Sequence, residues 1–153
     1  MIYLLNDFLK LRKTLKSKNL KLVFTNGCFD IIHRGHIEYL NRAKKLGDFL
    51  VVGLNSDKSV KLIKGSDRPV NNENDRAFVL DNIKPVDAVV IFNEKTPFII
   101  IKKILPDLLV KGGDWKEQNI VGADVVTKNG GKVLSLPFIN GYSTTEIIKK
   151  GKK

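Results

Sequence analysis

The two histidines of the chain, His33 and His36, lie three residues apart with Gly35 between them. They follow residues 25–30, Thr-Asn-Gly-Cys-Phe-Asp, in which Gly27 would let backbone amides come close to a phosphate. A helix that begins near Gly35 would direct its amide dipoles at the same place. This stretch therefore predicts a binding site for a phosphate or another anion.

Two other interpretations of the histidines stay open at this point. A metal site would need a third His, Cys or carboxylate ligand at a suitable spacing, and none is evident beyond Asp30. The histidines could also lie at a helix N-terminus without a chemical role. Cys28 lies in the same loop, and we do not interpret it as a nucleophile.

Two later stretches add groups that suit a nucleotide. Residues 143–145, Ser-Thr-Thr, precede a helical pattern, where hydroxyls and free amides would hold a triphosphate. Ser143 or Thr144 could instead serve only as a helix cap. Residues 111–114, Lys-Gly-Gly-Asp, follow a buried apolar run, and Asp114 could accept hydrogen bonds from ribose hydroxyls.

Cations gather around a loop that contains Gly65 and Pro69, where mobile side chains could close over phosphates. Lys64 and Arg68 are the two that we favour for this role. Asp57, earlier in the same region, is interpreted as a turn or helix-cap residue. The cations of this region are Lys61, Lys64, Arg68 and Arg76.

The elements that must position these residues alternate between strands and helices. Short runs rich in Val, Ile, Leu and Phe predict buried strands at residues 20–24, 49–54, 86–92, 108–110 and 133–136. Helical spacing of apolar residues predicts helices at 4–15, 36–46, 73–83, 97–105, 120–128 and 144–150. The alternation predicts a Rossmann-like α/β fold, a parallel five-stranded sheet with helices on both faces. Ligands bind such a sheet at the carboxyl ends of its strands.

Length and composition fit one domain. The chain has 153 residues, of which 42% are hydrophobic, and we assign 1–18 to a leading helix, 19–150 to the domain and 151–153 to a basic tail. No apolar run approaches the roughly 20 residues that cross a bilayer, and the single cysteine forms no intramolecular disulfide, so we expect a cytoplasmic protein. The net charge of +11 indicates anionic partners.

His33-Arg34-Gly35-His36, placed after a strand and a glycine turn, resembles the HxGH signature of the nucleotidyltransferase superfamily, and residues 26–30 resemble its GTFD element. Over residues 20–149 the sequence is similar to the heptose 1-phosphate adenylyltransferases, which in many bacteria form the C-terminal half of a fusion with a sugar kinase. The resemblance implies transfer of AMP from ATP, with Mg²⁺, to D-glycero-D-manno-heptose 1-phosphate. The product would supply heptose for lipopolysaccharide or another surface polysaccharide. Relatives often pair, so a homodimer is expected.

The resemblance also implies a role for each candidate residue, with no metal ligand among them. The catalytic residues would be His33, His36 and Lys64. The nucleotide-binding residues would be Thr25, Asn26, Gly27, Cys28, Phe29, Gly35, Lys111, Gly112, Asp114, Ser143, Thr144 and Thr145. The sugar-phosphate-binding residues would be Asp30, Lys61, Arg68 and Arg76.

Glycerol-3-phosphate cytidylyltransferases are the nearest alternative. Their arginine shortly before Ser-Thr-Thr is replaced near Phe138 by apolar residues, and their Arg-Tyr-Val-Asp becomes Lys-Pro-Val-Asp at 84–87. Cys28 stands where much of the superfamily has threonine, so any hydrogen bond from it to the nucleotide would be weak. A basic nucleic-acid-binding module is the non-enzyme alternative, but the scattered aromatic residues form no stacking platform. We therefore expect neither nucleic acid nor a membrane as a partner.

Overall fold

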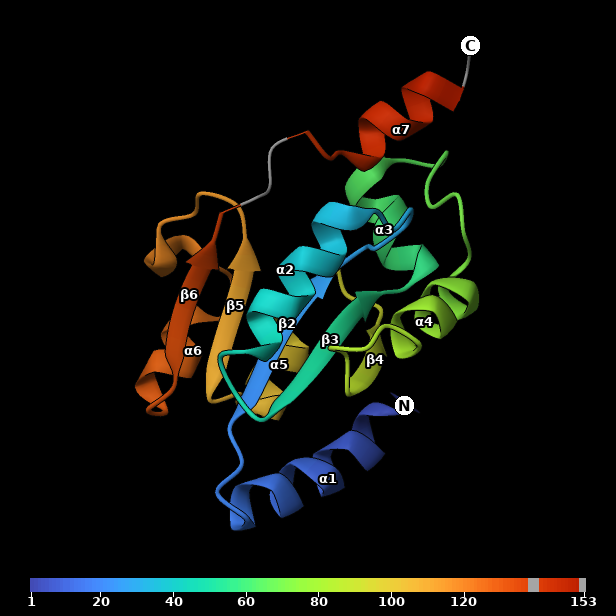
Figure 1. Cartoon of the computed structure of the whole chain (residues 1–153). Coiled ribbons are helices and arrows are strands. Elements are labelled where there is room, and N and C mark those ends of the chain that lie inside the picture. Colours follow the sequence, from blue (N-terminus) through green and yellow to red (C-terminus); the bar gives the residue numbers. More distant parts are fainter. Residues whose placement is uncertain (138–140, 152–153) are drawn as a thin grey trace.

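The computed structural model describes residues 1–137 and 141–151. Within them, six strands form one sheet in which every neighbouring pair is parallel, in the order β1-β4-β3-β2-β5-β6 (Figure 1). The parallel sheet is confirmed, but it has six strands rather than five, because the chain adds a short strand beside β4. The strands are β1 (Ile2–Tyr3), β2 (Leu22–Gly27), β3 (Phe49–Asn55), β4 (Ala88–Phe92), β5 (Leu108–Gly112) and β6 (Lys132–Leu136).

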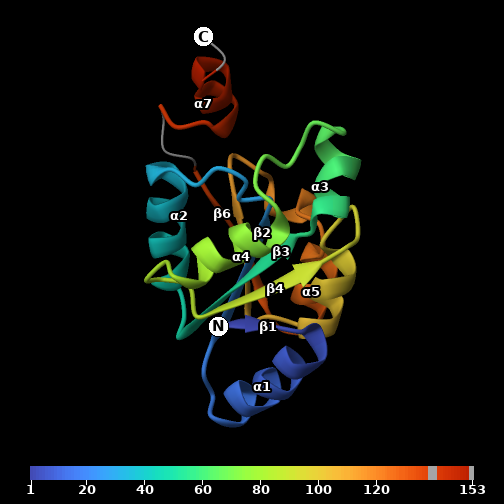
Figure 2. The same ribbon diagram turned by 90° about the vertical axis from the view of Figure 1, so that its right-hand side faces the viewer.

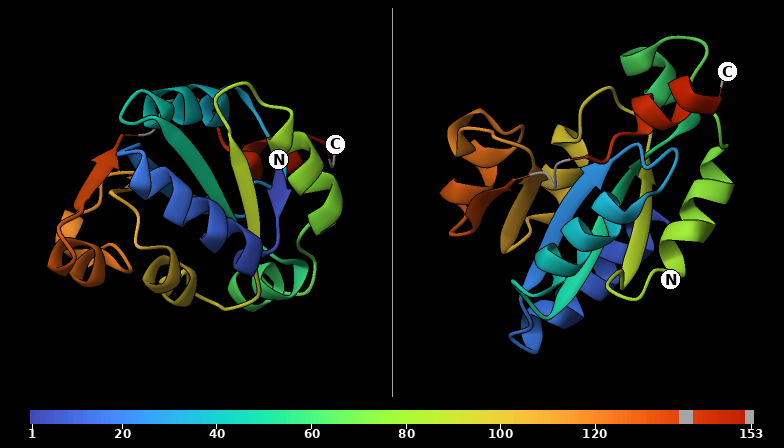
Figure 3. Two further views of the ribbon diagram at one scale, coloured as in Figure 1. Left: turned by 90° about the horizontal axis from the view of Figure 1, so that it is seen from below. Right: turned by 45° about the horizontal axis from the view of Figure 1, so that its top comes forward.

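Helices cover both faces of this sheet (Figures 2 and 3). Helices α1, α5 and α6 pack on one face, and α2 and α4 pack on the other. Helix α7 lies beyond the carboxyl ends of the strands (Figure 1). The helices are α1 (Leu5–Ser17), α2 (Arg34–Lys44), α3 (Asp57–Lys64), α4 (Glu73–Asp81), α5 (Phe98–Ile104), α6 (Ala123–Lys128) and α7 (Thr144–Gly151), with a 3-10 helix, η1 (Glu117–Asn119).

The leading helix is part of the domain rather than an appendage. Phe8 and Leu15 of α1 belong to the same buried cluster as Ile101 of α5. Arg12 of α1 pairs with Asp107 at the start of β5, with both nitrogen–oxygen distances at 3.0 Å. Burial by itself would raise the pKa of Asp107, but the hydrogen bonds from Arg12 and from a backbone amide outweigh it and lower that pKa. The segment 1–18 is therefore fixed to the sheet by packing and by an ion pair.

One helix was not predicted from the sequence. The residues after β3 form α3, whose first helical residue is Asp57 and whose cap is Ser56, the Oγ of which accepts a hydrogen bond from Ser59 N at 3.2 Å. Phe138 and residues 152–153 of the basic tail, which entered the sequence predictions, lie outside the described residues. None of the helices in the described ranges is both long and apolar enough to pass through a membrane.

The strand order places a crevice between β2 and β5. From β2 the chain proceeds outward to β3 and β4, and it then returns to the other side of β2 to form β5 and β6. The loops that leave the carboxyl ends of β2 and β5 therefore diverge toward opposite faces of the sheet. Ligands bind parallel sheets at such a point, and the predicted phosphate-binding stretch follows β2 directly.

Candidate active site

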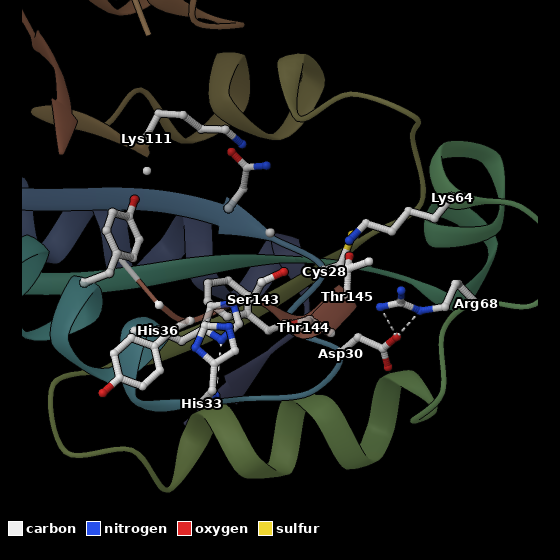
Figure 4. Close-up of a pocket in the computed structure, with 18 residues that line it drawn as sticks. Cys28, Asp30, His33, His36, Lys64, Arg68, Lys111, Ser143, Thr144 and Thr145 are labelled. Carbon is white, nitrogen blue, oxygen red and sulfur yellow. Dashed lines mark hydrogen bonds and ion pairs between the residues drawn. The ribbon is translucent and has the colours of Figure 1, made fainter. Parts of the chain in front are cut away.

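A cavity of about 570 Å³ opens at the carboxyl ends of β2 and β5 (Figure 4). The β2–α2 loop, the start of α2, the end of α3, the end of β5 and the start of α7 contribute its walls. We call it the first cavity. The structure brings most of the predicted site residues together here: Asn26, Gly27, Cys28, Phe29, Asp30, His33, Gly35, His36, Lys64, Arg68, Lys111, Gly112, Ser143, Thr144 and Thr145.

The β2–α2 loop turns just after Gly27, the last residue of β2. Phe29 adopts a left-handed backbone conformation with φ of 43°, and its ring packs back over Gly27. A Cβ at position 27 would lie 2.9 Å from Phe29 Cε2, so any other residue there would force the Phe29 ring to shift. Gly27 therefore allows the aromatic ring to close the turn and keeps the backbone of the loop open to the cavity.

His33 and His36 stack against each other at the start of α2. Their ring centroids are 3.9 Å apart with an interplanar angle of 27°, and the Phe29 ring lies 5.4 Å from that of His36. His33 N donates to His36 Nδ1 at 3.3 Å. A Cβ at Gly35 would lie 3.0 Å from Tyr142 Cβ and 3.1 Å from the His33 ring, so a larger residue there would push against both side chains.

This arrangement decides the protonation of His36. Burial, with smaller contributions from His33 and Lys64, lowers its pKa from 6.5 to about 4, so the ring is neutral at pH 7. Because Nδ1 accepts a hydrogen bond, the neutral ring carries its proton on Nε2, which is then a hydrogen-bond donor. Burial also lowers the pKa of His33. Both rings are therefore suited to donate to a phosphate rather than to act as permanent cations.

Two lysines reach the first cavity from different elements. Lys64 is the exposed last residue of α3 and points toward the cavity (Figure 4). Lys111 lies on β5, where burial lowers its pKa while the neighbouring Cys28 acts in the opposite direction. An anionic ligand would replace the water that the Lys111 ammonium group loses on burial, which favours binding of phosphate groups here.

The start of α7 closes the first cavity on the side of the histidines. Thr144 Oγ1 donates to the Ile31 carbonyl at 3.1 Å and so ties α7 to the β2–α2 loop. Ile147 N donates to the Ser143 carbonyl at 3.1 Å, which makes Ser143 the residue that precedes the helix. The Tyr142 ring stacks on His33 at a centroid distance of 6.1 Å. The amides of the first turn of α7 are thus directed at the same space as the histidines.

Four predicted site residues do not line this cavity. Thr25 is fully buried, and its Oγ1 lies 2.6 Å from the Tyr39 hydroxyl. Asp114 and Lys61 are exposed on the surface. The prediction of a mobile cation was wrong for Arg76, which is 1% exposed because its guanidinium donates to backbone carbonyls and pairs with the Asp57 carboxylate.

A second cavity, of about 380 Å³, adjoins the first. Asn26, Gly27, Cys28 and Lys111 line both. Most of the other residues of the second cavity were not predicted, because they come from separate segments that carry no recognisable motif. These residues are Asn55, Ile63, Lys95, Thr96, Pro97, Trp115, Asn119, Ile120 and Val121.

Curated relatives match most of this chain but only part of their own length. The bifunctional protein HldE of Campylobacter concisus (strain 13826) is 57% identical over 130 residues, which cover 85% of this chain and 27% of that protein. The bifunctional protein HldE of a Nitratiruptor species is 51% identical over 138 residues, which cover 90% of this chain and 29% of that protein. The chain therefore spans less than a third of the length of these relatives.

Solved structures show the same fold. The lipopolysaccharide core biosynthesis protein from Thermoplasma volcanium GSS1 has a TM-score of 0.63 and 31% identity, over 81% of this chain and 99% of that one. Pantoate-beta-alanine ligase from Francisella tularensis, in complex with beta-gamma ATP and beta-alanine, has a TM-score of 0.65 over 99% of this chain and 77% of that one. Its identity is 16%, so this likeness concerns the fold alone.

The family comparison covers the whole of the candidate site. The cytidylyltransferase-like family matches residues 24–150, which include every residue that lines the two cavities. The match extends over most of the chain and agrees with the HxGH stretch at the start of α2. The chain belongs to the cytidylyltransferase-like family.

Proposed function

We propose that this protein transfers AMP from ATP to D-glycero-D-manno-heptose 1-phosphate and so forms ADP-heptose and pyrophosphate. The relatives that are more than 50% identical support this assignment, because they are named HldE, the name of the heptose 1-phosphate adenylyltransferase fusion proteins. The solved relative described as a lipopolysaccharide core biosynthesis protein supports a use of the product in surface polysaccharide. Glycerol-3-phosphate cytidylyltransfer is the alternative that the experiment below must separate.

The observation that carries the proposal is the wall shared by the two cavities. Group transfer between two substrates requires that both reach one reacting atom from opposite sides. Asn26, Gly27, Cys28 and Lys111 line both cavities, so a phosphoryl group held there would be accessible from each. We assign the nucleotide to the first cavity, where the histidines and the start of α7 gather, and the sugar phosphate to the second.

In this assignment the acceptor is a phosphate oxygen of the sugar phosphate, which is already anionic at neutral pH. It forms a bond to the α-phosphorus of ATP while the bond from that phosphorus to the bridging oxygen of pyrophosphate breaks, and the electron pair leaves with pyrophosphate. No general base is needed. His36 Nε2, together with His33 and Lys64, would donate to the phosphoryl oxygens as negative charge develops there.

The second cavity is a better binding site for the sugar phosphate than the cation-rich region that the sequence indicated for it. Lys95 supplies a positive charge, Thr96 and Asn55 supply hydrogen-bonding groups, and Trp115 offers a flat apolar surface of the kind on which sugar rings pack. Of the four residues expected at the sugar phosphate, Asp30, Lys61, Arg68 and Arg76, none lines this cavity. We therefore relocate the acceptor site from the α3–α4 region to the side of Trp115.

Three further expectations belong to this proposal. No group of three or more His, Cys, Asp or Glu side chains that could hold a metal ion occurs in the described part of the chain, so we propose that Mg²⁺ enters with ATP as part of the substrate. We place the reaction in the cytoplasm, where ATP is available. A homodimer is the expected assembly, and light scattering of the purified protein measures it.

The test is pyrophosphate release by the purified protein with Mg²⁺. ATP and CTP are each combined with the two anomers of heptose 1-phosphate and with glycerol 3-phosphate. We expect release with ATP and one heptose 1-phosphate anomer. Release with CTP and glycerol 3-phosphate would replace the proposal with the cytidylyltransferase alternative, and an absence of release in every combination would reject both. Trp115→Ala should raise the KM for the sugar phosphate more than that for ATP.

A further inference from the structure

Asp30 and Arg68 line the first cavity, yet both are already engaged by the protein. The Asp30 side chain is 1% exposed and accepts hydrogen bonds from Arg68 Nε at 2.7 Å and from the backbone amides of Val70 and Asn71, each at 2.9 Å. Asn71 Nδ2 donates to the Asp30 carbonyl at 2.7 Å. The loop at 65–72, which follows α3, is thus attached to the β2–α2 loop through one aspartate (Figure 4).

The charge state of Asp30 argues against a substrate contact. Burial would raise its pKa, but hydrogen bonds from Asn71, Val70 and Arg68 outweigh burial and lower it, so the carboxylate is ionised at neutral pH. An ionised carboxylate would repel a phosphate. Its oxygens are also occupied by donors from the loop, so the aspartate has a structural partner in place of a ligand.

Arg76 holds the same loop from the other side. Its Nη1 donates to the carbonyls of Cys28 and Asn55, at 2.6 and 2.8 Å, and its Nε donates to the Asn71 carbonyl at 2.9 Å. Its Nη2 pairs with Asp57 in the first turn of α3 at 2.8 Å. Helix α3 is therefore fixed near its beginning by Arg76 and just beyond its end by Asp30.

We propose that Asp30, Arg68 and Arg76 are positioning residues, which hold α3 so that Lys64 at its end faces the first cavity. Lys64 itself is exposed and lines the cavity, whereas Arg68 pairs with the buried Asp30 and Arg76 binds backbone carbonyls and the partly exposed Asp57. Their positive charges thus serve the geometry of the site and do not bind the sugar phosphate. The kinetic part of the test rests on the proposed function.

A double-mutant cycle distinguishes positioning from binding. Arg68→Met and Asp30→Asn should each lower kcat about tenfold or more, because small displacements of a catalytic group are costly, while the KM for heptose 1-phosphate stays within about twofold. The double variant should be no slower than the slower single variant, since both changes break one connection. Lys58→Met, which removes an exposed charge of α3 outside both cavities, is the matched control.

A readout without turnover keeps this test independent of the proposed function. Hydrogen exchange at the amides of Val70 and Asn71, which donate to Asp30, should be faster in Arg68→Met and unchanged in Lys58→Met. Arg68→Lys should recover part of both kcat and protection relative to Arg68→Met, and this rescue tests the inference without the cycle if Asp30→Asn does not fold. A large rise in the KM for the sugar phosphate, multiplicative effects in the double variant, or unchanged exchange would each overturn the inference. A wild-type protein without activity would reject the proposed function alone.

Discussion

Replacement of His36 by asparagine and by glutamine separates the roles of its two ring nitrogens. Nδ1 accepts the hydrogen bond from His33 N at 3.3 Å, so Nε2 is the donor available to a phosphate. An asparagine side chain keeps an oxygen near the position of Nδ1 but has nothing at Nε2. A glutamine side chain brings an amide N–H near the position of Nε2. His36→Asn should therefore keep the start of α2 intact while it removes the donor.

The size of the effect follows from the donor's place in the reaction. A donor directed at charge that develops in the transition state is worth about 3 kcal/mol, so His36→Asn should lower kcat about 100-fold or more. His36→Gln should lose only about tenfold, because its amide restores a donor in imperfect geometry. The KM for ATP should change less than kcat in both variants, since the lost interaction is made mainly in the transition state.

Pyrophosphate release at saturating ATP and heptose 1-phosphate measures the effect, with thermal unfolding recorded in parallel. An unchanged Tm assigns the loss of turnover to the missing donor rather than to a damaged fold. Turnover of His36→Asn within about threefold of the wild type, or a His36→Gln variant no faster than His36→Asn, would refute the donor role of Nε2.

Two further predictions concern stability. The pKa of His36 is about 4 in the folded chain and 6.5 in the unfolded one, so between these pH values only the unfolded state binds the proton. The free energy of unfolding should therefore fall as the pH drops from 6.5 toward 4. Urea unfolding at pH 7 and 4.5 measures this fall, which should be smaller in His36→Gln. Tyr39→Phe removes the hydroxyl that lies 2.6 Å from Thr25 Oγ1 and 3.3 Å from the Val110 carbonyl. The loss should lower the free energy of unfolding by about 1–2 kcal/mol. An unchanged urea midpoint would contradict this prediction.

The strands and helices that carry a clear periodic pattern could be predicted from the sequence. Buried parallel strands appear as apolar runs, and β2 to β6 lie where such runs occur. Besides the three-residue η1, two elements could not be predicted. The two residues of β1 are too few to show a period, and α3 follows Ser56 and Asp57, a pair that fits a turn as well as a helix start.

Two cationic side chains of one stretch have different roles, and only the folded structure distinguishes them. Lys64 and Arg76 both belong to the cation-rich region that the sequence marked for phosphates. The structure leaves Lys64 exposed at the first cavity and buries Arg76 against carbonyl groups of three different segments. Formal charge is readable from a sequence, but the partner that neutralises it depends on which segments meet.

The sequence by itself determined the fold class, the family and the phosphate-binding stretch of the first cavity, because the β2–α2 loop and HxGH stretch are continuous and a motif there is also a local structure. The tertiary structure alone decided the second cavity, which draws Asn55 from the end of β3 and Lys95, Trp115 and Val121 from the segments after β4, β5 and η1. It also decided that Asp30 faces Arg68 rather than a substrate. Contacts between distant segments depend on strand order and helix packing, and these arise from the burial of the whole chain rather than from any one stretch of it.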